Sequence, residues 1–171
     1  MPNWVFNTLT IEGPEETITR LRKILAEPSK FQTEKQEPIF SFNNIIPIDD
    51  KDETISAHDV WGTKWDACFV EALEVENEKT NLAYKFETAW SVAQPVFEEL
   101  AAQNPDVEIV LDFEEETGWF GDAVWKNGVE FQSRVIEPAC HQDYVDGDRV
   151  CQCENDEAVY EDCPNYEDPE D

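Results

Sequence analysis

The stretch VEIVLDFEEETGWFGDAVWKNGVEFQSRVI, residues 107–136, decides the fold class of this chain. Its first part, residues 107–114, has the cleanest period-two alternation in the sequence and predicts a half-buried β-strand. Two more extended segments follow, at residues 119–126 and 129–136. They are joined by Asn127-Gly128, the strongest short-range signal for a two-residue hairpin turn. The core is therefore predicted to end with a strand and a β-hairpin.

Five elements precede this stretch, and each is bounded by turn or cap residues. Apolar residues at three-to-four spacing predict helices, whereas aromatic and β-branched runs predict strands. In chain order we expect a strand at residues 4–11, a helix at 15–25, a hairpin of strands at 64–75 and 82–90, and a helix at 95–102.

This order, β-α-β-β-α-β with an added hairpin, belongs to the α+β class. Short connections and right-handed crossovers favour a ferredoxin-like antiparallel sheet with two helices on one face, extended by a C-terminal hairpin. Residues 1–138 are predicted to form this domain, with a long, partly packed loop at residues 28–60. Residues 139–171 form an acidic tail with cysteines and few large apolar residues, so it cannot add much to the core.

Charge narrows the classes of partner. The chain has 40 acidic and 12 basic residues, a formal charge of −28, which repels phosphate backbones. We therefore expect no direct nucleic-acid binding. No apolar run approaches the roughly 20 residues of a membrane span, and nothing at the N-terminus reads as a signal peptide. The expected location is the cytoplasm, with no membrane partner.

Five short segments carry a resemblance to a known family. They are Met1-Pro2-Asn3-Trp4, Trp61-Gly62-Thr63-Lys64-Trp65-Asp66, Phe86-Glu87-Thr88-Ala89-Trp90-Ser91, Pro95-Val96 and residues 115–121. Over residues 1–135 the chain resembles the YubB ferredoxin-like domain family of phage and plasmid proteins. The resemblance implies a fold, a mobile-element setting and a bacterial host cytoplasm, rather than a mechanism.

The run of residues 61–66 is the main candidate for a binding site. Its two indoles could stack on a planar ligand or a partner side chain, while its lysine supplies a point charge. The alternative is that both indoles pack in the core and the lysine pairs with a carboxylate. The full candidate set is Trp61, Gly62, Thr63, Lys64, Trp65, Asp66, Trp90, Glu116 and Trp119.

Signals for catalysis are missing and those for metal are weak. No Ser-His-Asp, Cys-His or phosphate-binding glycine pattern accompanies the acidic residues, so no catalytic residue is assigned. The tail offers enough soft ligands for tetrahedral zinc, but free thiols are the default interpretation. The zinc candidates are Cys140, His141, Cys151, Cys153 and Cys163, and no other cofactor is expected.

Together these patterns predict a non-enzymatic phage or mobile-element accessory protein that binds a host protein. Its acidic surface and tail would face a basic patch on that host protein, because complementary charge speeds association. In a subsidiary version the carboxylates imitate nucleic-acid phosphates. The alternative is a small-ligand-binding or enzymatic domain that uses residues 61–66.

Overall fold

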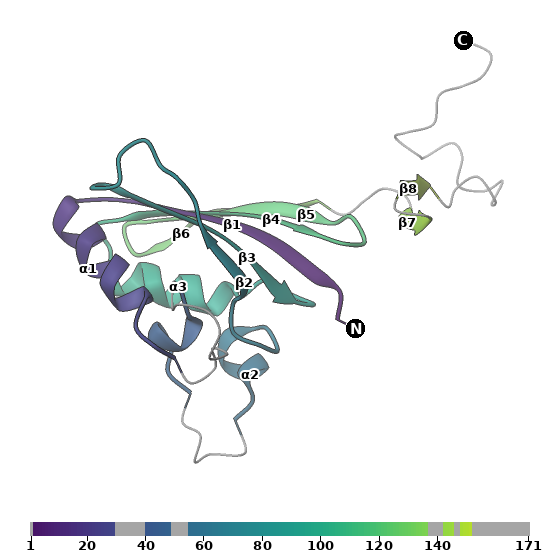
Figure 1. Ribbon diagram of the computed structural model, residues 1–171, viewed down its shortest axis with the longest axis horizontal. Coiled ribbons are helices and arrows are strands. Elements are labelled where there is room, and N and C mark those ends of the chain that lie inside the picture. Colours follow the sequence, from purple (N-terminus) through teal and green to yellow (C-terminus); the bar gives the residue numbers. More distant parts are fainter. Residues whose placement is uncertain (1, 30–39, 49–54, 137–141, 146–147, 152–171) are drawn as a thin grey trace, which may run out of the picture.

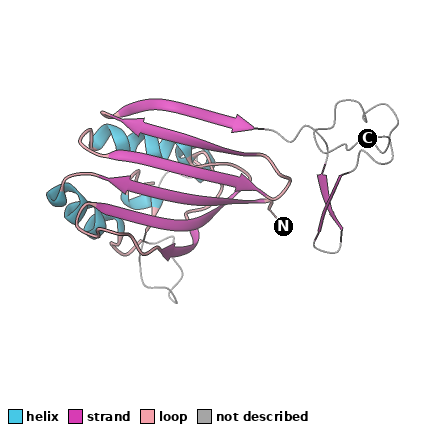
Figure 2. Ribbon diagram, turned by 90° about the horizontal axis from the view of Figure 1, so that it is seen from above, coloured by secondary structure: helices cyan, strands magenta, loops and turns pink. Residues whose placement is uncertain are grey.

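A computed structural model of the chain describes residues 2–29, 40–48, 55–136, 142–145 and 148–151. Its main body has two layers, a twisted six-stranded sheet and a layer of helices on one face of it (Figures 1 and 2). The elements are β1 (Trp4–Glu12), α1 (Glu15–Leu25), the 3-10 helix η1 (Phe42–Asn44), α2 (Ala57–Trp61), β2 (Cys68–Ala72), β3 (Asn81–Ala89), α3 (Gln94–Gln103), β4 (Glu108–Glu115), β5 (Phe120–Lys126) and β6 (Val129–Ile136).

The strand order is β2-β3-β1-β4-β5-β6, and every neighbouring pair is antiparallel. The first four positions, read from β2 to β4, are those of a ferredoxin-like sheet, and the β5–β6 hairpin extends it past β4. The predicted fold class is confirmed. Two consecutive left-handed residues, Asn127 at φ 55 and Gly128 at φ 80, make the tight turn between β5 and β6.

The hydrophobic core lies between the sheet and the helices. One face of each central strand alternates inward, so that Leu9 on β1, Phe86 on β3 and Leu111 on β4 are buried. Helix α1 covers this face with Ile18 and Leu21. Among the described residues, no helix lies over the sheet's other face (Figure 2), and outward residues such as Phe6 are exposed there.

The predicted loop at residues 28–60 contains more structure than expected. Phe40 and Phe42 are buried and pack against Phe86, Phe40 with a tilted ring at a centroid distance of 5.3 Å and Phe42 edge-on at 5.8 Å. Helix α2 was not predicted, although its capping box between Ser56 and Asp59 has a sequence signature. These contacts make the described part of the loop a portion of the core.

The predicted strand at residues 64–75 is shorter in the structure, where β2 spans only Cys68–Ala72. The residues before it are held by side-chain bonds to η1 and β3 instead of a strand ladder. The pairing of β2 with β3 also shifts register between Cys68 and Glu71, where Phe69 has a left-handed φ of 51°.

In the tail, β7 (Gln142–Val145) and β8 (Asp148–Cys151) form a separate two-stranded antiparallel sheet. Cys140, His141, Cys153 and Cys163 lie outside the described residues, as does the side chain of Cys151. The zinc site therefore stays a prediction. Within the ranges that the structure describes, no helix is both long and apolar enough to cross a membrane.

Candidate functional site

The run of residues 61–66 divides into buried and exposed side chains. Trp61 is fully buried, and its Nε1 donates to the Ile46 carbonyl at 2.8 Å. Thr63 is also fully buried, and its Oγ1 donates to the Ala89 carbonyl at 3.0 Å and accepts from the Ala89 amide at 3.2 Å. Gly62 ends α2 in the left-handed region at φ 76. These three residues connect the segment between α2 and β2 to the core.

Asp66 is the buried acid of the run, with 6% of its surface exposed. Its Oδ2 accepts from the Ser41 hydroxyl at 2.5 Å, and its Oδ1 accepts from the amides of Phe42 at 2.7 Å and Ala67 at 2.8 Å. Burial raises the pKa of Asp66, and these hydrogen bonds partly oppose the shift. Asp66 thus joins the start of β2 to η1 and does not face a ligand.

Lys64 and Trp65 are exposed and lie with Trp90, which follows β3. The Trp65 and Trp90 rings stack at a centroid distance of 6.3 Å with 30° between their planes, and 40% and 48% of these residues are exposed. The Lys64 ammonium lies 5.3 Å from the Trp65 centroid and 4.7 Å from that of Trp90. Both distances are within cation–π range.

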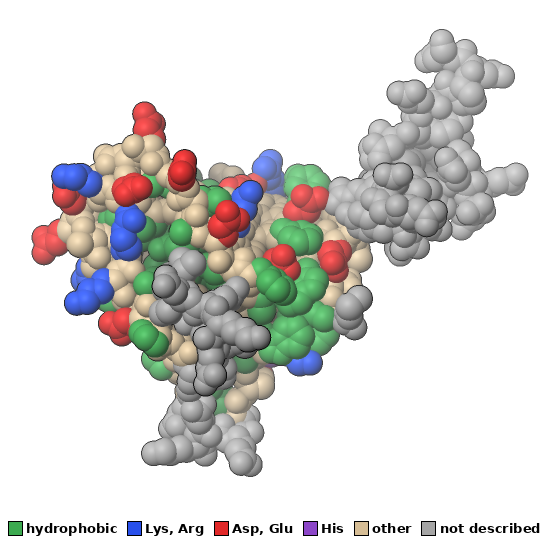
Figure 3. All heavy atoms as spheres, viewed as in Figure 1, with side chains coloured by type: hydrophobic (Ala, Val, Ile, Leu, Met, Phe, Trp, Pro, Cys, Tyr) green, Lys and Arg blue, Asp and Glu red, His purple; other side chains and the backbone are tan. Residues whose placement is uncertain are grey.

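This ring pair continues into a row of four aromatics. Trp4, at the start of β1, lies 5.8 Å from Trp65, and Phe69 packs edge-on against Trp4 at 5.5 Å. We call Trp90, Trp65, Trp4 and Phe69 the aromatic row. Figure 3 shows hydrophobic side chains gathered near the start of β1, with acidic side chains among them. A row of partly exposed large aromatics is typical of contact surfaces.

Two members of the aromatic row have unusual backbones. Phe69 has φ 51° and Trp90 has φ 68°, in a region that bulky side chains rarely adopt. Each such residue costs on the order of 1–3 kcal/mol, and such residues cluster at binding and catalytic sites. The fold maintains two strained positions that present exposed rings to one surface.

The last two predicted residues lie apart from each other. Glu116 meets the aromatic row, because its Oε2 accepts from the Trp4 amide at 2.8 Å. Trp119 is half-buried and packs edge-on against Phe113 at 5.8 Å, in a separate cavity of about 300 Å³ that Trp125 also lines. The structure therefore brings Lys64, Trp65, Trp90 and Glu116 together and places Trp119 elsewhere.

The aromatic row borders a broad groove on the open face of the sheet, about 800 Å³ in volume. This groove was not predicted from the sequence. Most of its lining side chains come from the positions of the alternating strands that face away from the helices. Side chains from all six strands line it, and Phe69 belongs to both groove and row. Its main lining residues are the aromatics Phe6, Phe69 and Phe120, the acids Glu71, Glu87, Asp112, Glu114 and Asp122, and the bases Lys85 and Arg134.

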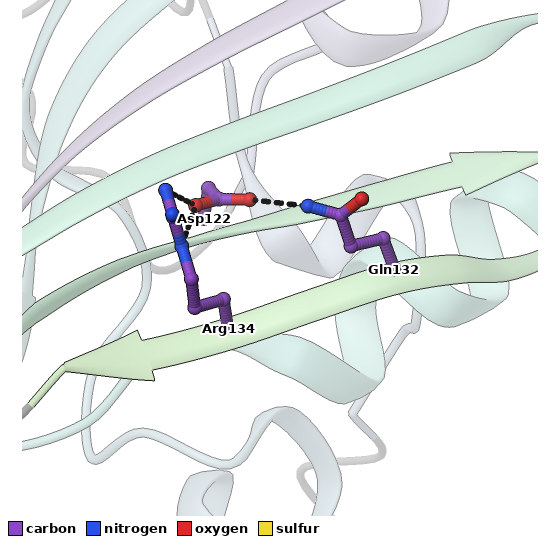
Figure 4. A network of polar contacts seen from close by, with 3 residues as sticks. All are labelled: Asp122, Gln132 and Arg134. Carbon is purple, nitrogen blue, oxygen red and sulfur yellow. Dashed lines mark hydrogen bonds and ion pairs between the residues drawn. The ribbon is translucent and has the colours of Figure 1, made fainter.

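Like charges lie close together in this groove. The pKa of Glu87 is raised by partial burial and by the neighbouring Glu116. The pKa of Asp112 is raised by partial burial and by Asp122. Figure 4 shows that Arg134 is already paired with Asp122, at 2.9 Å from its Nε, while Gln132 donates to the same carboxylate at 3.3 Å. The groove therefore has a surplus of negative charge.

Nucleophilic and metal chemistry have little support here. The half-buried Cys68 has a pKa raised to about 11 by burial and by the charges of Asp66 and Glu87, so its thiol stays protonated at neutral pH. Within the described residues, no group of three or more His, Cys, Asp or Glu side chains could hold a metal ion. The groove instead combines carboxylates with exposed aromatic rings.

Comparison with known proteins agrees with the fold. No curated protein and no solved structure matches the chain. One family model does match, over residues 61–160, which cover the strands from β2 to β8 as well as α3. The narrower resemblance to YubB proteins, and a phage or plasmid origin, stay predictions. By this match to more than half of its length, the chain belongs to the family described as the ferredoxin-like domain in Api92-like protein.

Proposed function

We propose that this chain is a non-enzymatic binding module whose sheet groove holds a basic segment of a partner protein. The observation that carries the proposal is the groove itself, which combines five carboxylates with exposed aromatic rings and only two basic residues. An open sheet face suits an extended segment, whose alternate side chains point the same way.

The charges in the groove give a physical reason for binding. Glu87 beside Glu116 and Asp112 beside Asp122 repel each other in the free protein, which is one reason why the pKa values of Glu87 and Asp112 are raised. A bound guanidinium or ammonium group would relieve this repulsion. The remaining negative charge would steer a basic partner toward the surface and speed its association.

The setting that we propose is the cytoplasm of a bacterial host, where a phage or mobile element would use this protein against a host protein. If that host protein normally binds nucleic acid, the carboxylates would take the place of phosphates. The acidic tail, with 12 acids and one arginine in residues 139–171, would add long-range attraction.

A labelled peptide of alternating Arg and Ser tests the groove. Binding would be followed by fluorescence anisotropy at ~50 mM salt, where screening is weak. The groove variant is Glu71→Gln, Glu87→Gln and Asp112→Asn. Its control, Glu16→Gln, Glu27→Gln and Glu76→Gln, removes the same charge from exposed residues outside the groove.

We expect the groove variant to bind the peptide about ten-fold more weakly than the protein without substitutions, since three close charges are lost. The control variant should lose about two-fold, because it changes only the net charge. Equal losses in both variants would show that the peptide responds to overall acidity and would overturn the proposal.

The alternative, a small-ligand or enzymatic site at residues 61–66, has less support. Trp61, Thr63 and Asp66 are buried and hydrogen-bonded inside the fold, which leaves Lys64 and Trp65 for a ligand. Those two exposed residues lie beside the groove and suit a contact with the same partner.

A further inference from the structure

Lys64 lies on aromatic rings although the chain is rich in acids. In the part of the chain that the structure describes, Lys64 makes no ion pair, whereas Lys79, Lys126 and Arg134 do. Its ammonium instead contacts two indoles, at 4.7 and 5.3 Å from their centroids. The pair Trp65 and Trp90 is therefore a cation site that a residue of the same chain occupies.

An arginine would suit this site better than a lysine. The two rings are stacked within 30° of parallel, and a planar guanidinium can lie flat against an indole. Both rings are close to half exposed, so a side chain from outside can reach them. Lys64 is itself exposed, and its flexible stem allows it to leave without moving the backbone.

The site is continuous with the groove. From Trp90 the aromatic row runs through Trp65 and Trp4 to Phe69, with successive centroid distances of 6.3, 5.8 and 5.5 Å. Phe69 is 62% exposed and lines the groove. One extended segment could therefore place basic side chains over the carboxylates and another basic side chain on the two indoles.

We infer that Trp65 and Trp90 form an arginine-binding site for the partner and that Lys64 occupies it in the free protein. This inference rests on the proposed function, because it describes how the same partner is recognised. Binding exchanges one cation for another. The Lys64 ammonium moves into water, and the partner's guanidinium takes its place on the indoles.

The test uses the same Arg-Ser peptide and the full chain. Lys64→Ala empties the site, and Lys23→Ala on α1 removes an equal charge from an exposed position elsewhere. We expect Lys64→Ala to tighten peptide binding about three-fold, in the range of one exposed cation–π contact. Lys23→Ala should tighten it less than about 1.5-fold, through net charge alone.

A second variant tests the indoles themselves. Trp90→Asn removes the ring but suits the left-handed backbone, because Asn tolerates positive φ. Its control is Phe131→Ala, which removes an exposed ring that also has a lysine, Lys126, over it at 5.2 Å. We expect Trp90→Asn to weaken binding about five-fold and to cancel the gain from Lys64→Ala. Phe131→Ala should have no effect.

The outcomes separate this inference from the proposed function. If Lys64→Ala changes binding no more than Lys23→Ala, or if Trp90→Asn behaves like Phe131→Ala, the arginine site is wrong. The groove can still be right in that case, provided that the groove variant loses more than its control. A peptide with Lys in place of Arg should show a smaller response to Lys64→Ala, and an equal response would contradict the guanidinium preference.

Discussion

Replacing Asp66 tests whether this acid, predicted as a binding residue, is structural. Its carboxylate accepts three hydrogen bonds, from Ser41, Phe42 and Ala67. In Asp66→Ala the Phe42 amide and the Ser41 hydroxyl, both in fully buried residues, lose their acceptor. Each unsatisfied buried donor costs about 1–3 kcal/mol, so the two together predict a loss of about 2–6 kcal/mol in the free energy of unfolding. That is a large fraction of typical domain stability.

Asp66→Asn is the matched control. The amide oxygen can replace Oδ1, which accepts both backbone bonds, and the amide nitrogen can donate to the Ser41 oxygen. All three contacts are kept, so we expect a loss of less than about 1 kcal/mol near neutral pH. Urea unfolding of the unsubstituted protein, Asp66→Ala and Asp66→Asn, followed by circular dichroism, measures both losses. The comparison requires that the three proteins have equal m-values.

The pH dependence gives a further check on Asp66. Because its pKa is raised in the folded state, the folded protein binds this proton more tightly than the unfolded chain. The contribution of Asp66 to stability is therefore greatest at low pH and falls as pH rises through its raised pKa. Asn does not titrate. The amount by which Asp66→Asn is less stable than the protein without substitutions should therefore shrink as pH rises through that pKa. An Ala loss below about 1 kcal/mol, or an Asn loss equal to that of Ala, would refute the reasoning.

Two further predictions follow from the raised pKa values. In a chain whose tail cysteines are all changed to serine, Cys68 should react with a thiol reagent at pH 8 about two orders of magnitude more slowly than free cysteine, since a pKa of about 11 leaves little thiolate. A rate within about ten-fold of free cysteine would contradict this. Binding of the Arg-Ser peptide should strengthen as pH rises through the raised pKa values of Glu87 and Asp112, because the peptide favours their charged forms. Anisotropy titrations from pH 4 to 7 measure this. A flat affinity in the protein without substitutions, or an equal rise in the groove variant, which lacks both carboxylates, would count against it.

Most of the fold follows from local patterns in the sequence. The Asn127-Gly128 turn and both strands of its hairpin are predicted from their residues, and β6 has the predicted bounds of Val129–Ile136. Helix α1 also matches its prediction, with acids in its first turn and bases in its last. Such elements are predictable because turn residues, caps and hydrophobic periodicity act over a few neighbouring residues.

The run of residues 61–66 shows where local reasoning stops. Residue types alone could not say that Trp61 is buried under η1 while Trp65 is exposed beside Trp90, since both are tryptophans in one short turn. The difference comes from partners distant in sequence, namely Ile46 for Trp61 and Trp4 and Trp90 for Trp65. Burial is a property of the packed chain.

The sequence by itself therefore determined the acidity of this protein, its α+β class and the order of its strands. Only the tertiary structure decided which of the carboxylates lie together. Antiparallel pairing places the outward residues of all six strands side by side, so that acids spaced far apart in the chain line one groove. The same pairing brings Trp4 from β1, Phe69 from β2 and Trp90 from the end of β3 into one aromatic row. Strand register, which depends on contacts across the whole sheet, created the candidate site.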